Sequence, residues 1–155
     1  MKKQKIYVDT SVVGGCFDEE FSLWSNGLMK DFLVGNFLPI VSEIVTSEIA
    51  PAPKRVREKY VELIDMGAEI LTVSDEAMQL LRMYQKRTVL SDNFENDMLH
   101  IALATIAQID AVVSWNFKHI VHFDKIRLFN GVNIESGYKP IAIYSPREVT
   151  NYGEV

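Results

Sequence analysis

Short runs of β-branched and aromatic residues alternate along the chain with longer segments in which apolar residues recur at helical spacing. The short runs predict strands at residues 4–8, 37–41, 69–73, 111–114 and 141–144. The longer segments predict helices at residues 22–34, 42–50, 54–66, 93–109 and after Ser74 or Asp75, with shorter helical turns at 116–123 and after Pro146. This alternation is typical of an α/β protein with a parallel sheet covered on both faces.

Local signals mark several of the expected boundaries. Ser42 is a typical N-cap residue and directly precedes a helical segment. Gly14 and Gly15 indicate a loop after the first strand. Asp92 and Glu95 have the spacing of a capping box at the start of the most apolar helix. Because that helix is apolar almost all round, we expect it to be buried.

Composition narrows the class of protein. The 155 residues suffice for one domain, expected over 1–155, and the hydrophobic share of 48% and charged share of 24% are ordinary for a globular protein. No apolar run is long enough to cross a bilayer, and the single cysteine, Cys16, excludes an internal disulfide, so we expect a cytoplasmic protein. The net charge of −5 argues against a broad nucleic-acid-coating surface but leaves a metal-dependent nuclease open.

Asp9 is the first candidate for chemistry. It follows the first strand directly and is followed by the hydroxyls of Thr10 and Ser11. Ligands of open α/β sheets bind at the carboxyl ends of the strands, which makes Asp9 a candidate metal ligand. The alternative is an aspartate whose side chain caps the next turn.

Asp97 lies in the most apolar helix of the chain. A carboxylate buried there has to be paired, bind a metal or take up a proton. His100, three residues on, is the nearest basic partner within the helix. The alternative is that Asp97 lies in the first helical turn and complements the helix dipole.

Glu43 and Glu48 compete for one role in the helix expected at 42–50. They are five residues apart, so their side chains point about 140° apart around the helix. Glu43 lies in the first turn, where an acid is favoured by the dipole alone, whereas Glu48 lies in the last turn, where it is not. A residue placed against its local preference indicates another purpose. We therefore predict that Glu48 is the site residue, with Glu43 as the second choice.

Asn116 follows the fourth strand, with Ser114 and His119 close by in sequence. Its amide oxygen is suited to weak metal binding or to orienting a water, although Asn116 also suits the cap of a short helix. The candidates are mainly carboxylates, with neither a CxxC nor an HExxH motif. Hard oxygen ligands predict Mg²⁺ or Mn²⁺ rather than zinc.

Four stretches in this order resemble the PIN domain family of metal-dependent nucleases, which includes the VapC toxin ribonucleases of bacterial toxin–antitoxin pairs. They are IYVDTS at residues 6–11, VSEIVTSEI at 41–49, NDMLHIALA at 96–104 and VVSWN at 112–116. The resemblance covers roughly residues 4–125. It implies a three-layer α/β/α sandwich with a mainly parallel sheet and acidic residues gathered at one end.

The resemblance also implies roles for individual residues. Asp9, Glu48 and Asp97 match the core acids and would hold Mg²⁺ or Mn²⁺, with Thr10, Ser11 and Ser114 in support. Many family members carry an acid where this chain has Asn116, so we expect one firmly held metal ion and assign Asn116 to the catalytic set.

The chemistry proposed for these residues is hydrolysis of a phosphodiester, with Glu48 holding a water or assisting its deprotonation, and the resemblance implies that the substrate is RNA. Lys118 and His119 lie where RNA would approach. Four basic residues form a further cluster, which we interpret as a solvated helix face rather than an RNA groove: Lys54, Arg55, Arg57 and Lys59.

Two other functions are alternatives to the nuclease. A haloacid-dehalogenase-type phosphotransferase also begins with a strand-end aspartate, but it needs a second Asp where Ser11 stands. A catalytically inactive PIN-like module that binds RNA or a protein remains the alternative. For a toxin we expect an antitoxin partner and a homodimer, and four apolar residues suit either a dimer contact or the core: Leu23, Trp24, Leu28 and Phe32.

Overall fold

A computed structural model describes residues 2–152 of the chain. The strands are β1 (Lys5–Val8), β2 (Leu38–Ser42), β3 (Glu69–Leu71), β4 (Ala111–Val113) and β5 (Ala142–Tyr144). The helices are α1 (Thr10–Gly15), α2 (Ser22–Leu33), α3 (Glu43–Ile49), α4 (Lys54–Asp65), α5 (Asp75–Lys86), α6 (Glu95–Ile106), α7 (Phe123–Glu135) and α8 (Pro146–Val149), with a 3₁₀ turn η1 (Asp92–Phe94). Each predicted strand is present, with ends that differ by at most two residues.

The sheet is parallel throughout, with the strand order β3-β2-β1-β4-β5. Tyr7 in β1 pairs with Ile40 of β2 on one side and with Val112 of β4 on the other. These strands are buried on both faces, which explains why they read as continuous apolar runs rather than alternating ones. The predicted α/β class with a parallel sheet is confirmed.

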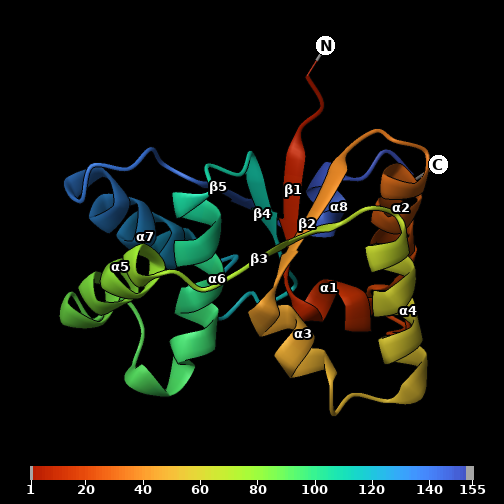
Figure 1. Cartoon of the computed structure of the whole chain (residues 1–155), viewed down its shortest axis with the longest axis horizontal. Coiled ribbons are helices and arrows are strands. Elements are labelled where there is room, and N and C mark those ends of the chain that lie inside the picture. Colours follow the sequence, from red (N-terminus) through yellow and green to blue (C-terminus); the bar gives the residue numbers. More distant parts are fainter. Residues whose placement is uncertain (1, 153–155) are drawn as a thin grey trace.

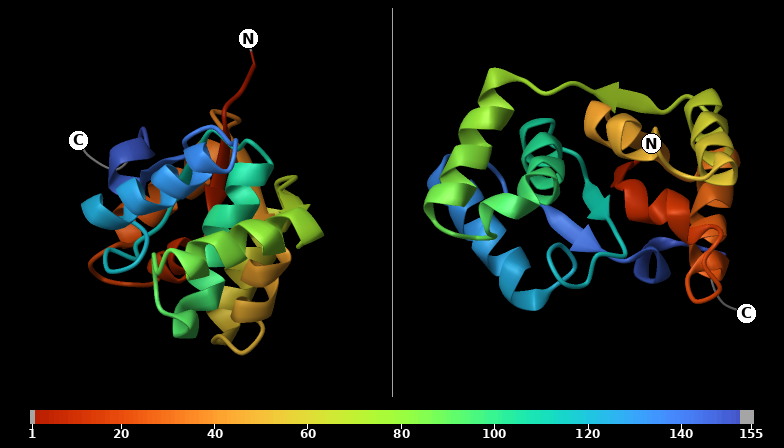
Figure 2. Two further views of the ribbon diagram at one scale, coloured as in Figure 1. Left: turned by 90° about the vertical axis from the view of Figure 1, so that its left-hand side faces the viewer. Right: turned by 90° about the horizontal axis from the view of Figure 1, so that it is seen from below.

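Helices cover both faces of the sheet and make three layers (Figure 1). α1, α2, α3, α4 and α8 pack together on one face, and α5, α6 and α7 on the other. The chain leaves β1 for the first face and β4 for the second, so the order of connections reverses between these neighbouring strands. Ligands of open α/β sheets bind outside the carboxyl ends at such a reversal. That edge faces the viewer in the right-hand view of Figure 2.

The segment after β1 differs from the prediction. Gly14 and Gly15 do not form a loop but complete helix α1, and neither has a positive φ. A side chain at Gly15 would place its Cβ 2.6 Å from Ser25 Oγ and 2.7 Å from Trp115 Nε1. Gly15 therefore serves the close approach of α1 to Trp115 rather than a turn.

Two further predictions at helix ends are wrong. Residues 116–123 form turns rather than a helix, and the sequence did not predict α7, which begins at Phe123. Asp92 and Glu95 do not form a capping box, because a 3₁₀ turn precedes α6 and Phe94 occupies its N-cap position. The N-cap at Ser42 is confirmed, since Ser42 Oγ accepts a hydrogen bond from the backbone N–H of Ile44.

The domain expected over residues 1–155 includes Met1 and residues 153–155, which lie outside the described part of the chain. Between residues 2 and 152, no helix is both long enough and apolar enough to cross a membrane. The most apolar helix, α6, is buried against the sheet and against α5 as predicted.

Candidate functional site

Asp9 lies at the carboxyl end of β1 and occupies the N-cap position of α1. The residue is 4% exposed. Its Oδ1 accepts a hydrogen bond from Ser11 Oγ and its Oδ2 accepts one from Ser114 Oγ, each at 2.6 Å. Its side chain makes no capping hydrogen bond to α1, so the alternative of a capping aspartate is wrong.

The two serines that hold Asp9 are themselves oriented by backbone donors. Ser11 Oγ accepts a hydrogen bond from the N–H of Trp115, and Ser114 Oγ accepts one from the N–H of Asn116, each at 2.9 Å. A hydroxyl that accepts from a backbone N–H still has its own proton to donate. Both protons therefore point to the Asp9 carboxylate.

Burial raises the pKa of the Asp9 carboxyl above its ordinary value, and the nearby charge of Glu48 raises it further. The positive charge of His100 and the two serine hydroxyls lower the pKa, but they do not cancel the effect of burial. Asp9 is thus a carboxylate whose charge is only partly compensated by its surroundings.

Glu48 lies in the last turn of α3, and its side chain is 28% exposed. Glu48 Oε1 accepts a hydrogen bond from Thr10 Oγ1 at 2.7 Å and lies 2.8 Å from His100 Nε2. Burial alone would raise the pKa of Glu48, but the hydrogen bond and charge of His100 and the hydrogen bond from Thr10 bring it below its ordinary value. Glu48 is therefore ionised at neutral pH.

A buried chain of polar groups continues behind Glu48. His100 is 2% exposed, and its Nδ1 lies 2.6 Å from the Tyr7 hydroxyl, which lies 2.8 Å from Ser42 Oγ. Burial raises the pKa of Tyr7 far above its ordinary value, so this hydroxyl keeps its proton. His100 therefore joins Glu48 to Tyr7, with one ring nitrogen directed at each of them.

Asp97 lies in the first turn of α6, as the dipole alternative predicted, and its side chain is 23% exposed. Asp97 Oδ2 lies 2.9 Å from Nδ1 of His119, whose ring packs on Phe94 with centroids 3.9 Å apart. The predicted pairing of Asp97 with His100 is wrong, because both ring nitrogens of His100 are engaged by residues of β1 and α3.

Asn116 and Glu43 do not point into this network. Asn116 Oδ1 accepts a hydrogen bond from the backbone N–H of His119 at 2.9 Å, so Asn116 caps the turn after β4. Glu43 Oε1 accepts a hydrogen bond from the backbone N–H of Val73 at 2.8 Å. Of the two glutamates of α3, only Glu48 contacts residues of the site.

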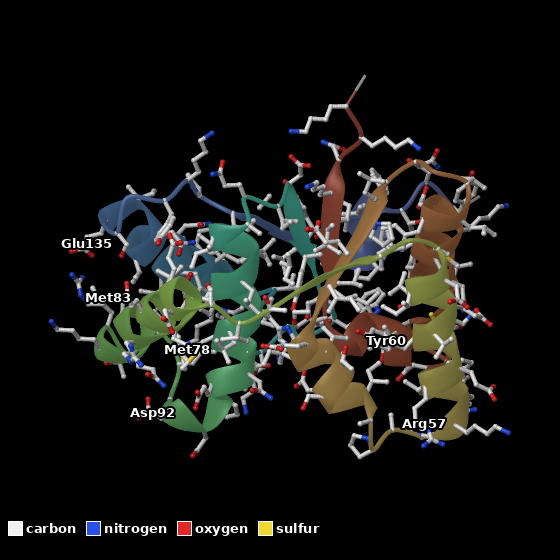
Figure 3. The ribbon with its side chains drawn as sticks, in the orientation of Figure 1. Arg57, Tyr60, Met78, Met83, Asp92 and Glu135 are labelled. Carbon is white, nitrogen blue, oxygen red and sulfur yellow. The ribbon has the colours of Figure 1, made fainter. Side chains whose placement is uncertain are left out.

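Glu48 and Asp97 share a cleft of about 430 Å³ beside the start of α6. The other residues that line it are Asp92, Asn93, Phe94, Glu95 and Asn96. Figure 3 shows Asp92 at the lower end of the molecule, the end to which the carboxyl ends of the strands point. The cleft is strongly acidic and leads to the outer two of the three predicted acids.

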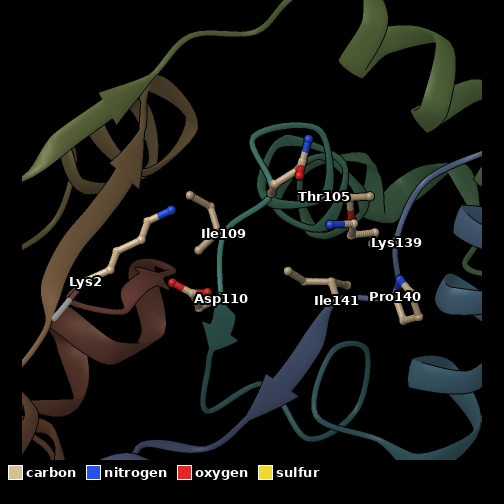
Figure 4. A pocket seen from close by; sticks show the side chains of 8 residues that line it. Lys2, Thr105, Ile109, Asp110, Lys139, Pro140 and Ile141 are labelled. Atoms are coloured by element: carbon tan, nitrogen blue, oxygen red, sulfur yellow. The ribbon is translucent and has the colours of Figure 1, made fainter.

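A second pocket lies at the opposite edge, beside the start of β4 (Figure 4). Its lining residues are Lys2, Thr105, Gln108, Ile109, Asp110, Lys139, Pro140 and Ile141. Asp110, its only carboxylate, accepts a hydrogen bond from the backbone N–H of Lys5 at 2.7 Å. This pocket is remote from the three acids and takes no part in the site.

The donor set of the site has the chemistry that Mg²⁺ and Mn²⁺ prefer, because it consists of carboxylate and hydroxyl oxygens. Within residues 2–152, however, no three side chains of Asp, Glu, His or Cys gather around one point. That arrangement does not fit zinc, which takes three or four protein ligands. It fits Mg²⁺, which is held by one or two carboxylates together with waters and substrate phosphates.

Three of the four basic residues of α4 are exposed, and Lys59 is partly buried. Lys54 and Lys59 pair with Glu58 and Glu62 at 3.7 and 3.0 Å, and Figure 3 shows Arg57 pointing away from the molecule. These contacts match the interpretation of the cluster as a solvated helix face.

The sequence left open whether four apolar residues of α2 belong to a dimer contact or to the core. The structure buries two of them and leaves the other two exposed or partly buried. Leu28 and Phe32 are buried in the core, as the second alternative predicted. Leu23 is exposed, and Trp24 is partly buried beneath the guanidinium of Arg147. Two of the four residues are therefore unavailable to a partner.

Comparison with known proteins shows a likeness of fold. No family model matches the chain, and no curated protein matches it significantly. Among solved structures it is similar to VapBC2 from Rickettsia felis bound to a DNA fragment from their promoter, with 16% identity over 92% of this chain and 98% of that chain and a TM-score of 0.60. It is also similar to FitAcB from Neisseria gonorrhoeae, with 12% identity over 93% and 99% of the two chains and a TM-score of 0.60. The predicted PIN-like α/β fold is confirmed.

Proposed function

We propose that this protein is a metal-dependent ribonuclease that hydrolyses RNA phosphodiester bonds and acts as the toxin of a toxin–antitoxin pair. The observation that carries the proposal is the state of Asp9, a buried carboxylate whose pKa stays raised although two serine hydroxyls and His100 lower it, near an ionised Glu48. Such a group is stabilised by a bound cation, and it lies at the edge of the sheet where α/β proteins bind ligands.

Each acid has a separate task in this proposal. Asp9 and Asp97 would hold Mg²⁺ or Mn²⁺, which supplies positive charge to the phosphoryl group and acidifies a water. Glu48 would orient a water, because an ionised carboxylate accepts hydrogen bonds from it. Thr10 and His100 fix the direction of Glu48 through their hydrogen bonds to Oε1.

An antitoxin partner is part of the same proposal. The solved structures that resemble this fold include a VapBC complex bound to promoter DNA, which supports a protein partner for this chain. The acidic cleft beside Glu48 and Asp97 would attract a basic segment of such a partner. We further propose that the protein is a homodimer in the cytoplasm.

A catalytically inactive PIN-like module is the second candidate function. Asn116 replaces an acid and uses its side-chain oxygen to cap a turn, and the described residues hold no ready-made three-ligand metal site. A module of this kind would bind RNA or a protein without cleaving RNA.

Cleavage of labelled single-stranded and structured RNAs in Mn²⁺, Mg²⁺ or EDTA tests the proposal. We expect metal-dependent cleavage by the wild type and a loss of at least about a hundredfold in Asp97→Asn, the size of effect that loss of one electrostatic contact at a reacting group produces. Asp92→Asn is the matched control, because Asp92 lines the same cleft but is not one of the three proposed acids. Equal cleavage by wild type and Asp97→Asn would refute the site, and metal binding without cleavage of any RNA would favour the inactive module.

A further inference from the structure

The turn between β4 and α7 places two side chains in solvent at the rim of the site. Asn116 O accepts hydrogen bonds from the N–H groups of Ile120 and Val121 at 3.0 and 2.8 Å, which closes the turn. Within it, Phe117 and Lys118 are exposed, whereas Ile120 is fully buried. The turn therefore has a fixed base and an exposed tip formed by one aromatic ring and one ammonium group.

The base of this turn is tied to the site at three points. The N–H groups of Trp115 and Asn116 donate to the two serine hydroxyls that hold Asp9. His119 Nδ1 lies 2.9 Å from Asp97 Oδ2. Because residues on both sides of the tip contact the site, the tip cannot lie far from the group that would be cleaved.

A rigid aromatic cluster backs the exposed ring. Phe117 is 48% exposed, and its ring centroid lies 6.1 Å from that of Trp115 and 6.3 Å from that of Phe21. Trp115 and Phe21 stack on each other at 4.2 Å, and Ser25 Oγ accepts a hydrogen bond from Trp115 Nε1. Phe117 is thus the outermost ring of an anchored group, half covered by it and half open to solvent.

The segment of the chain that carries the tip is basic, although the whole chain carries −5. Residues 117–127 include Lys118, Lys125 and Arg127 against the single acid Asp124. Lys118 makes no ion pair with any residue in the described part of the chain. A basic segment with an exposed aromatic ring is the arrangement with which proteins bind unpaired nucleotides.

We infer that Phe117 and Lys118 form a nucleotide-binding tip, in which an unpaired base next to the scissile phosphate stacks on Phe117 and a neighbouring phosphate binds Lys118. This inference rests on the proposed ribonuclease function and adds to it two residues that would bind the nucleotide beside the scissile phosphate. Stacking needs a free base face, which a base inside a duplex does not offer. Phe117 is accordingly a positioning residue and not a catalytic one.

Binding of a short end-labelled RNA, followed by fluorescence anisotropy in EDTA at low salt, tests the inference without requiring cleavage. Phe117→Ala should weaken binding of the single strand roughly tenfold, whereas binding of a duplex of the same sequence should not change. Phe117→Trp should restore the affinity, because the larger ring also stacks. Lys118→Ala should reduce the slope of log affinity against log salt by about 0.7, the contribution of one phosphate contact on a single strand.

Matched controls lie at the other edge of the sheet. Leu33→Ala removes an exposed apolar side chain at the end of α2, and Lys139→Ala removes a lysine of the remote pocket. Both should bind RNA as the wild type does. Unchanged single-strand affinity in Phe117→Ala, while the wild type cleaves RNA, would overturn the inference and leave the proposed function intact.

Two other results would also overturn it. A shift of Phe117→Ala in sedimentation velocity with unchanged RNA affinity would assign the tip to a contact between copies of the chain. A wild type that neither binds RNA in EDTA nor cleaves it in Mn²⁺ would remove the proposed function together with the tip.

Discussion

Two buried aspartates show how differently one chain treats the same side chain. Asp31 in α2 is fully buried and accepts four hydrogen bonds, from Asn36 Nδ2, Thr150 Oγ1 and both the N–H and Nδ2 of Asn151, at 2.7 to 3.1 Å. Asp9 is almost as buried but accepts only two, both from hydroxyls.

This difference in hydrogen bonding indicates a structural role for Asp31 and a functional role for Asp9. The donors around Asp31 come from amides and a hydroxyl of α2's own end and of the segment after α8, so Asp31 fastens that segment to the helix. For Asp9, the charge of a second carboxylate, Glu48, adds to the effect of burial in raising its pKa. A buried acid that is left short of donors is the better candidate for a cation site.

We expect the largest loss of stability when Asp31, the aspartate with four hydrogen-bond donors, is replaced. Asp31→Ala removes the buried acceptor of four hydrogen bonds and should lower the free energy of unfolding by about 3 kcal/mol. Asp9→Asn keeps its shape and removes an uncompensated charge, so it should cost much less. Urea denaturation of both variants tests this, and a larger loss in Asp9→Asn would invert the assignment of the two aspartates.

Substitutions of two glycines in α1, the helix that follows Asp9, should change stability by an intermediate amount. Gly15→Ala should lower stability by about 2 kcal/mol, because its Cβ would meet Ser25 and the Trp115 ring. Gly14→Ala is the neighbouring control: nothing lies within 4 Å of its Cβ, and it should gain about 0.5–1 kcal/mol. Thermal denaturation distinguishes them, and equal melting temperatures would contradict the close packing of α1 on Trp115.

The smallest effect is a pH dependence, measured in EDTA. Because the folded-state pKa of Asp9 is raised above 3.8, the folded protein binds a proton in a range where the unfolded chain does not. The contribution of Asp9 to stability should therefore fall as pH rises from about 4 through the raised pKa and stay level above it. Asp9→Asn lacks this change, so the stability of the wild type relative to Asp9→Asn should decrease with rising pH, and an increase would contradict the account.

Much of the fold was readable in the sequence because the strands are short apolar runs that end abruptly in polar residues. In a parallel sheet those ends meet at one edge, so the prediction for Asp9 followed from local pattern alone. α1 was missed because Gly14 and Gly15 look like loop residues until Trp115 lies against them. α7 was missed because Asn130 and Gly131 resemble a turn, whereas Asn130 instead bonds to Ile141.

The hydrogen-bond partners of His100 could not be predicted from the sequence for a different reason. Tyr7 and His100 are 93 residues apart, and Glu48 and His100 are 52 apart, so their pairing is decided by how α6 packs on the sheet. One signal was available: a histidine among the apolar residues of a buried helix needs partners for both ring nitrogens. That signal indicates a network but does not identify its members.

Thermal denaturation of the metal-free protein with and without added Mn²⁺ tests most directly whether Asp9 belongs to a cation site. A ligand that binds only the folded state raises the melting temperature. We expect Mn²⁺ to raise it in the wild type and in Asp110→Asn, which alters the remote pocket, but not in Asp9→Asn. No Mn²⁺-dependent rise in the wild type, or an equal rise in Asp9→Asn, would contradict the assignment of Asp9 to a metal site.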